Sequence, residues 1–463
     1  MTRIVQLEEK SILGKIRNGE IDAAMLSTTS LVDDIILTMH EKEILPCLKD
    51  GFLDKRADNT TIPFYLVMAL AIAAKMRVHT SLTKIPVALT SHRTICALGY
   101  SLWDNKRDLK RGLMSEGALR FIIDKYTHED FITGYIDTVQ KHIMPKLDLV
   151  SHIHILDCTK LAVNLKNENY EGSAVARDNS NRRSRGYKLA TLRGIVGDSG
   201  IIEDISFGAM NIDDRKLSEE MLKTTPVLKQ GDILINDKGF MSRDMLNHLK
   251  SVRGVDTYVP LKKNMEAYEV AVSQAKMINK WMTHPNKKRK GQKITFVPNL
   301  EKHWRSNNPK GDVPINGCVV WDTVTDEYFV FITTDTDRSA KQIVQTYELR
   351  PEIEEDYRQL KDFWKIADFK STKLHTILFH IVCVLLGYLF FQLYTMMPEG
   401  EEYAGKSLPV AVQYYQPVPS PYVVIYSGDV FGVLHFHEIM KIYAEPDLPP
   451  NAKRVLDEVI GEL

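Results

Sequence analysis

Residues 376–394 form an almost wholly apolar segment, which a folded chain has to remove from water. The segment is long enough to cross a bilayer as a helix. It contains His380 and Gln392 and follows closely on a highly charged stretch, and both features are more typical of a helix inside a protein core. We therefore expect a buried helix packed on a sheet, with His380 as a satisfied core histidine. A membrane anchor is the minority alternative.

Length and composition are those of a globular chain with two or three domains: 463 residues, 44% hydrophobic and 26% charged. Basic and acidic residues number 60 each, so net charge indicates no polyanionic partner, and any such partner would need local basic patches. The five cysteines are scattered without a CxxC pair, which argues against a disulfide framework or zinc knuckle and fits a reducing cytosol. The N-terminal sequence lacks the apolar region of a signal peptide.

Residues 1–147 show helical periodicity, and we predict an all-helical N-terminal region. Ser115 has the character of an N-cap before a run of apolar residues. A basic cluster just before it is compatible with a helix-turn-helix, although most helix pairs bind nothing. This cluster consists of Lys106, Arg107, Lys110 and Arg111. Helices are expected at residues 31–39, 63–76, 115–126 and 130–142.

From residue 148 onwards, apolar strands alternate with helices, which predicts an α/β core. Residues 153–156 and 233–236 have the pattern of short buried strands. Residues 187–196 and 201–207 are rich in β-formers and are separated by a glycine-bounded turn, which predicts a hairpin.

Residues 262–336 differ in character, and we interpret them as a β-rich insertion. A helix is expected at 265–280 and a strand pair at 317–323 and 327–333. The last segment is rich in Pro and Tyr and receives no role. The expected parts of the chain are therefore 1–147, 148–261, 262–336, 337–397 and 398–463.

The segment 347–361 has a charged face beside an apolar stripe. On one continuous helix, which turns about 100° per residue, four polar side chains fall within roughly 60° of arc: Tyr347, Arg350, Glu354 and Lys361. One carboxylate is then flanked by a phenol and two cations, which suits a metal ligand placed where phosphate is held. Salt bridges on an amphipathic surface helix are the default alternative. The stripe contains Leu349, Ile353, Tyr357, Leu360 and Trp364, whereas Glu348, Glu352, Glu355 and Asp356 are expected to project elsewhere.

Two further carboxylates follow apolar strands. Asp157 comes after His-Ile-His-Ile-Leu and Asp237 after Asp-Ile-Leu-Ile-Asn, so each is expected at a strand end, where α/β sheets place ligand-binding groups. Each Asp alone would equally be a turn former or a helix cap. Together with Glu354, they could converge at one sheet edge and would repel one another unless a cation neutralised them. Hard oxygen ligands of this kind suit Mg²⁺ or Mn²⁺.

These motifs resemble those of the DDE transposases of bacterial insertion sequences, in the group with a Tyr-Arg-Glu-Lys signature. The family pattern of Tyr, two residues, Arg, three residues, Glu, six residues and Lys is matched from Tyr347 to Lys361 without a gap. The family's Asp-x-Thr motif is matched at Asp157-Cys-Thr, and its Asp-x-Gly-aromatic motif at Asp237-Lys-Gly-Phe. The resemblance covers residues 153–396, about half of the chain.

The resemblance implies a ribonuclease-H-like catalytic core in which Asp157, Asp237 and Glu354 are catalytic and hold two divalent ions, Mg²⁺ or Mn²⁺. Two metals about 4 Å apart can activate a water or a 3′-hydroxyl and stabilise the leaving oxygen in phosphoryl transfer. The implied activity is cleavage at transposon ends and strand transfer into target DNA. The implied partners are double-stranded DNA, with terminal inverted repeats and target, and a second copy of the chain in a synaptic complex in the bacterial cytoplasm, at the nucleoid. The helical residues 1–147 would then bind DNA ends.

The resemblance also assigns DNA phosphate contacts to Tyr347, Arg350 and Lys361. Pro351 departs from the family, which often has Trp at this position, and a proline can kink a helix. Basic runs elsewhere add candidates for phosphate binding, although such runs are also common in solvated loops. These candidates are Lys238, Arg182, Arg183, Arg185, Lys287, Lys288 and Arg289. Some relatives stack a flipped base on an aromatic side chain, and the candidates for this role are Trp281, Trp304 and Trp321.

Two alternatives stay open beside an active transposase. One is a catalytically inactive DNA-binding descendant, and the other is a metal-dependent nuclease without strand transfer. His152 and His154 lie close to Asp157 and suggest a zinc site, but strand alternation places both on the face opposite Asp157. A packed or polar outer face is the preferred interpretation of the two histidines.

Overall fold

The structure is a computed structural model that describes residues 4–56, 62–103, 110–177, 181–197, 199–304, 311–406, 408–414 and 416–461. The chain forms two compact units, and each is described by itself. The central unit is Met144–Arg358, and the terminal unit combines Met1–Ile143 with Gln359–Leu463. Lys106 and Arg107 of the predicted basic cluster lie outside the described residues.

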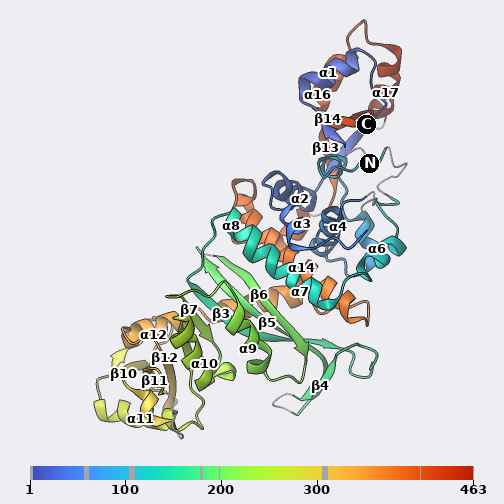
Figure 1. Ribbon diagram of the computed structural model, residues 1–463. Coiled ribbons are helices and arrows are strands. Elements are labelled where there is room, and N and C mark those ends of the chain that lie inside the picture. The colour runs from blue at the N-terminus through green and yellow to red at the C-terminus, as the bar shows by residue number, and fades with distance from the viewer. Residues whose placement is uncertain are drawn as a thin grey trace. The chain divides into compact units, whose positions relative to one another are not determined.

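A mixed sheet forms the middle of the central unit (Figure 1). Its strands β3, β7 and β8 run parallel to one another, and the other pairings are antiparallel. The predicted α/β class and the hairpin of β5 and β6 are confirmed. In spatial order the strands are β4 (Ala174–Arg177), β5 (Arg183–Val196), β3 (Ile153–Val163), β7 (Ile233–Asn236), β8 (Asp256–Pro260), β12 (Glu327–Thr333), β11 (Asn316–Asp322), β10 (Gln292–Val297) and β9 (Met282–Thr283), with β6 (Ser199–Ala209) also paired to β5.

Along β3 and β5, successive side chains point to opposite faces of the sheet, and these two faces have different surroundings. Leu156 and Leu192 pack into an apolar core with helices α9 (Asp214–Thr224) and α10 (Arg243–His248), which lie on one side of the sheet in Figure 1. Asp157 lies on the opposite face and receives helix α13 (Pro351–Arg358).

The block predicted as an insertion continues the same sheet. Strand β12 pairs antiparallel with β8, and Ile332 lies opposite Val259. Helix α11 (Glu266–Ile278) packs its alanine face against β11 and β12, and helix α12 (Ala340–Tyr347) follows β12 in the chain. The predicted helix and strand pair in this block are therefore confirmed.

The terminal unit contains a helical bundle around one long apolar helix. The predicted N-terminal helices are confirmed, and Ser115 caps α6 through its side chain. The helices are α2 (Leu31–Glu41), α3 (Cys47–Gly51), α4 (Phe64–Met76), α5 (His92–Ala97), α6 (Glu116–Ile123), α7 (His128–Asp137) and α14 (Leu374–Thr395).

Helix α14 is the apolar segment of the sequence. By length and composition it would suffice to cross a membrane, but 89% of its most apolar window is buried inside the protein, as in the core helix of a globular protein. Its neighbours in this unit include the helices α2, α4 and α7, whereas we expected a sheet. His380 is buried, its Nε2 lies 3.2 Å from the Lys365 carbonyl, and burial lowers its pKa to about 3. The expectation of a satisfied core histidine is confirmed.

The prediction of an all-helical N-terminal region is wrong, because two N-terminal segments are strands. Strands β1 (Val5–Gln6) and β2 (Ala23–Thr29) join β13 (Val418–Ser427) and β14 (Val430–His435) in a sheet of order β1-β14-β13-β2. Their pairing partners come from the other end of the chain, so local periodicity contains no sign of them.

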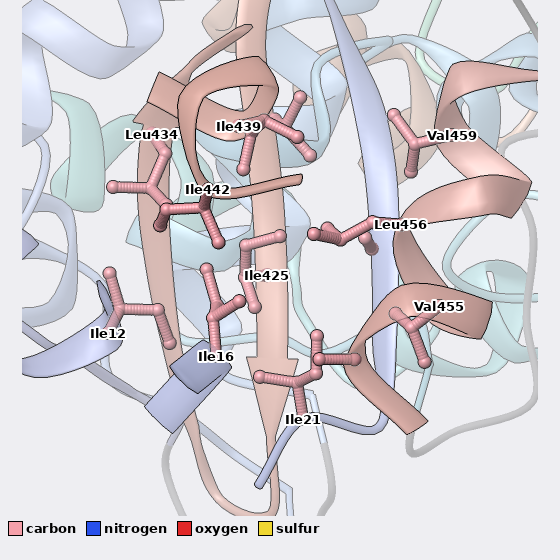
Figure 2. Packing of buried hydrophobic residues seen from close by; sticks show 13 residues of the cluster. Ile12, Ile16, Ile21, Ile425, Leu434, Ile439, Ile442, Val455, Leu456 and Val459 are labelled. Atoms are coloured by element: carbon pink, nitrogen blue, oxygen red, sulfur yellow. The ribbon is translucent and has the colours of Figure 1, made fainter. Parts of the chain in front are cut away.

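Helices from both chain ends cover this small sheet. Figure 2 shows their apolar side chains directed toward one another around Ile425 of β13. Gly432 of β14 is required by this packing, because a Cβ there would lie 2.6 Å from side-chain atoms of Ile12. The C-terminal residues without a predicted role therefore complete a core with the N-terminus. The helices are α1 (Glu9–Arg17), α16 (Phe436–Tyr443) and α17 (Pro450–Ile460).

Candidate active site

Two of the three predicted acids lie beside each other because β3 and β7 are parallel. The last residues that pair between these strands are Leu156 and Asn236, so Asp157 and Asp237 follow on neighbouring strands. Asp237 stands just beyond β7 and accepts a hydrogen bond from the Gly239 amide at 3.4 Å. The expectation of a strand end is confirmed for this residue.

Asp157 does not lie at a strand end, contrary to our expectation. Strand β3 continues to Val163, and Asp157 pairs with Thr191 of β5. The sequence suggested an end because polar residues follow Leu156. These polar residues still form a β ladder with β5, although β7 has already ended.

The Tyr-Arg-Glu-Lys segment is not one continuous helix. Helix α12 ends at Tyr347, a turn follows in which the Arg350 amide donates to the Tyr347 carbonyl at 3.0 Å, and α13 begins at Pro351. Proline suits a first helical position and has no N–H to continue the preceding helix. Lys361 lies in η6 (Gln359–Phe363), which belongs to the terminal unit. The single helical face predicted for these side chains is therefore wrong.

The turn nevertheless brings Arg350 to the acids. Its Nη2 lies 2.8 Å from Asp157 Oδ2, and its Nη1 donates a hydrogen bond to Glu354 Oε1. The side chain of Arg350 is 18% exposed, whereas that of Glu354 is 56% exposed. One guanidinium thus bridges a half-buried carboxylate and one that solvent reaches.

The charges of this site influence one another. Burial raises the pKa of Asp157 to about 6; Arg350 opposes the rise, and the negative charges of Asp237 and Glu354 add to it. Burial also raises the pKa of Tyr347, and the nearby Asp237 acts in the same direction. The pKa of Arg350 is raised as well, because these carboxylates outweigh the effect of its burial. The three predicted acids therefore share one electrostatic environment.

The donor set fits a hard divalent cation. Asp157, Asp237 and Glu354 offer carboxylate oxygens, the ligands that Mg²⁺ and Mn²⁺ prefer. This fit is one of ligand chemistry, because within the described ranges no three His, Cys, Asp or Glu side chains lie close enough together to hold a metal ion. Arg350 lies between two of these acids and offsets part of their charge.

Helix α13 is attached to the sheet by contacts that the sequence did not reveal. The Tyr357 hydroxyl donates to the Asp157 carbonyl at 2.7 Å, and the Thr191 hydroxyl lies 2.8 Å from the same Tyr357 oxygen. Arg193, two residues further along β5, binds Asp356 and Glu352 of α13. Ile353 is fully buried in the predicted apolar stripe. No motif signals Thr191 or Arg193, because only strand pairing shows what they face.

A cavity of about 410 Å³ adjoins the site. Phe329 and Phe331 of β12 form part of its apolar lining, and the Tyr347 ring lies 4.6 Å from that of Phe331. Arg350 and Glu348 belong to its polar lining. Tyr347 is therefore a wall of this cavity and a neighbour of the acids.

The predicted basic candidates differ in their exposure and in their contacts within the protein. Arg185 is bound within the protein, to Glu168 at 3.1 Å and to the Leu165 carbonyl at 3.2 Å. Arg289 lies 3.6 Å from Glu348. All candidates other than Arg185 are exposed, namely Lys238, Arg182, Arg183, Lys287, Lys288 and Arg289.

Two of the three candidate tryptophans form a cluster on the outer part of the sheet. The rings of Trp281 and Trp321 lie 5.3 Å apart, and Trp321 stacks on Tyr328 at 6.0 Å. Lys293 lies over the Trp321 ring at 5.6 Å. Trp304 instead packs against the apolar core of α11 and its strands.

The opposite face of β3 carries a sealed ionic group. His154 is fully buried, with Nδ1 2.8 Å from Glu203 Oε2 and Nε2 3.4 Å from Asp232 Oδ2. Burial disfavours the imidazolium, but hydrogen bonds and charges from Asp232 and Glu203 outweigh it and raise the pKa of His154 to about 9. The interpretation of a packed face is confirmed for His154. His152 is largely exposed and contacts Asp232.

Residues 155–390, just over half of the chain, match the family described as the Transposase DDE domain. The chain therefore belongs to this family of transposases. The match begins two residues before Asp157 and includes Asp237 and Glu354. No curated protein matches the chain.

Proposed function

We propose that this transposase cleaves DNA at transposon ends and joins the freed ends to target DNA in a reaction that depends on a divalent metal ion. Asp157, Asp237 and Glu354 are the proposed ligands and catalytic residues. The observation that carries the proposal is their shared electrostatic environment, in which Arg350 bridges Asp157 and Glu354.

Arg350 bridges Asp157 and Glu354, and Asp237 adds a third negative charge nearby, so a divalent cation would relieve the repulsion that remains. Mg²⁺ or Mn²⁺, expected as two ions, would polarise the phosphate and activate the attacking water or 3′-hydroxyl. The half-buried position of Asp157 favours such chemistry, because charges interact more strongly where water is scarce.

Arg350 is the proposed partner of a DNA phosphate. A guanidinium that neutralises carboxylates in the free protein becomes available once a cation takes over that task, and it can then bind phosphate in a bidentate manner. Tyr347, on the cavity wall beside it, and Lys361 complete the phosphate contacts of the proposed Tyr-Arg-Glu-Lys signature. The exposed Lys238 follows directly on Asp237 and is a further candidate.

The remaining assignments belong to the same proposal. A ribonuclease-H-like core is supported by the parallel strands β3 and β7, which place two acids side by side, and by the hairpin of β5 and β6. The resemblance of the Tyr-Arg-Glu-Lys spacing to that family implies an origin in a bacterial insertion sequence, double-stranded DNA with terminal repeats as substrate, and a dimeric synaptic complex in the cytoplasm. The helices of residues 1–147 are the proposed contact with DNA ends.

The test incubates the protein with DNA carrying the inverted repeats that flank its gene, with Mg²⁺ or Mn²⁺, and separates nicked from joined products. Joining by the wild type that is abolished by Glu354→Gln supports the proposal. The matched control is Glu355→Gln on the same helix, because Glu355 pairs with Arg358 and should be dispensable. Cleavage without joining would indicate a nuclease, and binding without any metal-dependent product would indicate an inactive DNA-binding protein.

A further inference from the structure

Arg193 connects β5 to the helix that carries Glu354. Its Nε lies 2.6 Å from Asp356 Oδ2, and its Nη1 lies 2.8 Å from Glu352 Oε2. The side chains of Arg193 and Asp356 are only 7% and 8% exposed, whereas that of Glu352 is 44% exposed. The contact with Asp356 is therefore a buried ion pair, and the contact with Glu352 lies at its rim.

The neighbouring strand makes room for this guanidinium. A Cβ at Gly200 of β6 would lie 1.9 Å from Arg193 Cζ, so only glycine leaves the space that Arg193 occupies. The pairing register of β5 and β6 also shifts between Leu192 and Arg193. Gly200 thus leaves a space on the neighbouring strand that the Arg193 guanidinium fills.

Helix geometry links this contact to Glu354. Glu352 and Asp356 are four residues apart and share one face of α13, whereas a residue two positions from each points about 200° away. Holding that face on β5 consequently turns Glu354 away from Arg193, and Glu354 meets Arg350 there. Tyr357 adds a second anchor through its hydrogen bond to the Asp157 carbonyl.

The energetics favour an orienting role over a purely stabilising one. A buried ion pair loses much of its attraction to desolvation, and apolar side chains of similar volume often stabilise a protein equally well or better. An ion pair instead imposes direction, because its hydrogen bonds allow few geometries.

We propose that Arg193 is a positioning residue for the reaction: it fixes the rotation of α13 and thereby the direction of Glu354 toward Asp157. The inference rests on the proposed function, since it assumes that Glu354 is a metal ligand. Gly200 and Asp356 support the same role of Arg193. Gly200 leaves space for its guanidinium, and Asp356 accepts a hydrogen bond from it.

The test compares Arg193→Met with the double variant Arg193→Met/Asp356→Leu. The single change leaves Asp356 buried without this guanidinium and should destabilise the protein, whereas the double change removes both charges and should recover stability. Both variants should bind Mn²⁺ in titration calorimetry about 10–100-fold more weakly than the wild type, the usual cost of losing a group that orients a ligand. Hydrogen exchange of the α13 amides should accelerate in both.

Two further variants separate orientation from stability. Gly200→Ala pushes the Arg193 guanidinium aside without altering either partner, and it should weaken Mn²⁺ binding in the same direction. Arg253→Gln is the matched control: Arg253 donates to the carbonyls of Leu222, Thr225 and Leu228, which lie in the same unit and outside α13. It should lower stability and leave Mn²⁺ affinity unchanged.

Glu354→Gln, measured in parallel, distinguishes the two proposals. If it weakens Mn²⁺ binding but Arg193→Met/Asp356→Leu binds Mn²⁺ like the wild type, the positioning role is overturned and the proposed function stands. If Glu354→Gln changes neither Mn²⁺ affinity nor DNA cleavage, the proposed function fails and the positioning role fails with it.

Discussion

The two faces of the central sheet both hold charged groups near strand β3, but they differ in access to solvent. On the α9 side, His154 and Glu203 are fully buried and contact each other. On the α13 side, Arg350 bridges Asp157 and Glu354, and the side chain of Glu354 is 56% exposed. A buried ionic group has little opportunity to exchange partners, so its interactions contribute only to the free energy of unfolding. An open group can exchange a guanidinium for an ion or a phosphate, which is what a site requires.

The largest expected effect is on the open face. Asp157→Asn should reduce metal-dependent cleavage of transposon-end DNA by at least about 10²–10³-fold, because the proposed metal loses a charged ligand. The free energy of unfolding should not fall, since the change relieves repulsion from Asp237 and Glu354. Gel assays of cleavage and urea denaturation measure the two quantities. A variant that unfolds readily would contradict the distinction between the faces.

The sealed face should show the opposite behaviour. His154→Phe deprives Glu203 and Asp232 of a buried cation and should cost about 3–5 kcal/mol of unfolding free energy, measured by urea denaturation. The control His152→Phe changes a side chain that is 77% exposed and should cost less than about 0.5 kcal/mol. If both changes cost the same, burial does not decide the role of these histidines.

Stability should also fall at alkaline pH because of His154. Its folded pKa of about 9 lies above the unfolded value of about 6.5, so protonation favours the folded state. The contribution, about 3 kcal/mol, is complete below about pH 6.5 and is lost as the pH rises through about 9. Unfolding free energies measured from pH 6 to pH 10 test this, and His154→Phe should remove most of the decline. A decline of equal size in that variant would assign the effect to another group.

A smaller effect is expected for the bridging guanidinium itself. Arg350→Gln removes the cation that competes with a metal, so Mn²⁺ affinity of the free protein should rise by about tenfold, within the usual range of coupling free energies. Affinity for transposon-end DNA should fall, because a proposed phosphate contact is lost. Titration calorimetry and DNA binding assays measure the two changes. Weaker Mn²⁺ binding would show that Arg350 organises the acids and does not compete for them.

The features that could be predicted from the sequence are those that depend on interactions between residues close together in the chain. The strand before Asp237, the β5–β6 hairpin and helix α11 depend on patterns within a few residues, and these predictions are confirmed. The three candidate acids were selected from local motifs, and their charges influence one another in the structure. Pro351 was recognised as a residue that can kink a helix, but the break before α13 and the turn of Arg350 toward Asp157 were not predicted.

Apart from the continuous helix expected over residues 347–361, the errors involve partners that are distant in sequence. Strand β2 was missed because it pairs with β13 from the other chain end. Asp157 was placed at a strand end because the continued pairing of β3 depends on β5 and not on the residues around it. Arg193 carries no motif, and its proposed role depends on Gly200 and Asp356, which only the fold brings near it.

The smallest effect concerns the basic run between β9 and β10, where a nearby acid decides the outcome. Lys287, Lys288, Arg289 and Lys290 are all exposed, but Arg289 lies 3.6 Å from Glu348. Each phosphate neutralised adds about 0.9 to the slope of log affinity against log salt concentration. Replacing the three lysines by glutamine should therefore flatten this slope by up to about 3 in DNA binding measured at several salt concentrations, whatever the DNA sequence. Arg289→Gln should change it less, because its charge is already partly offset; an unchanged slope in the triple variant would remove this run from the DNA-binding surface.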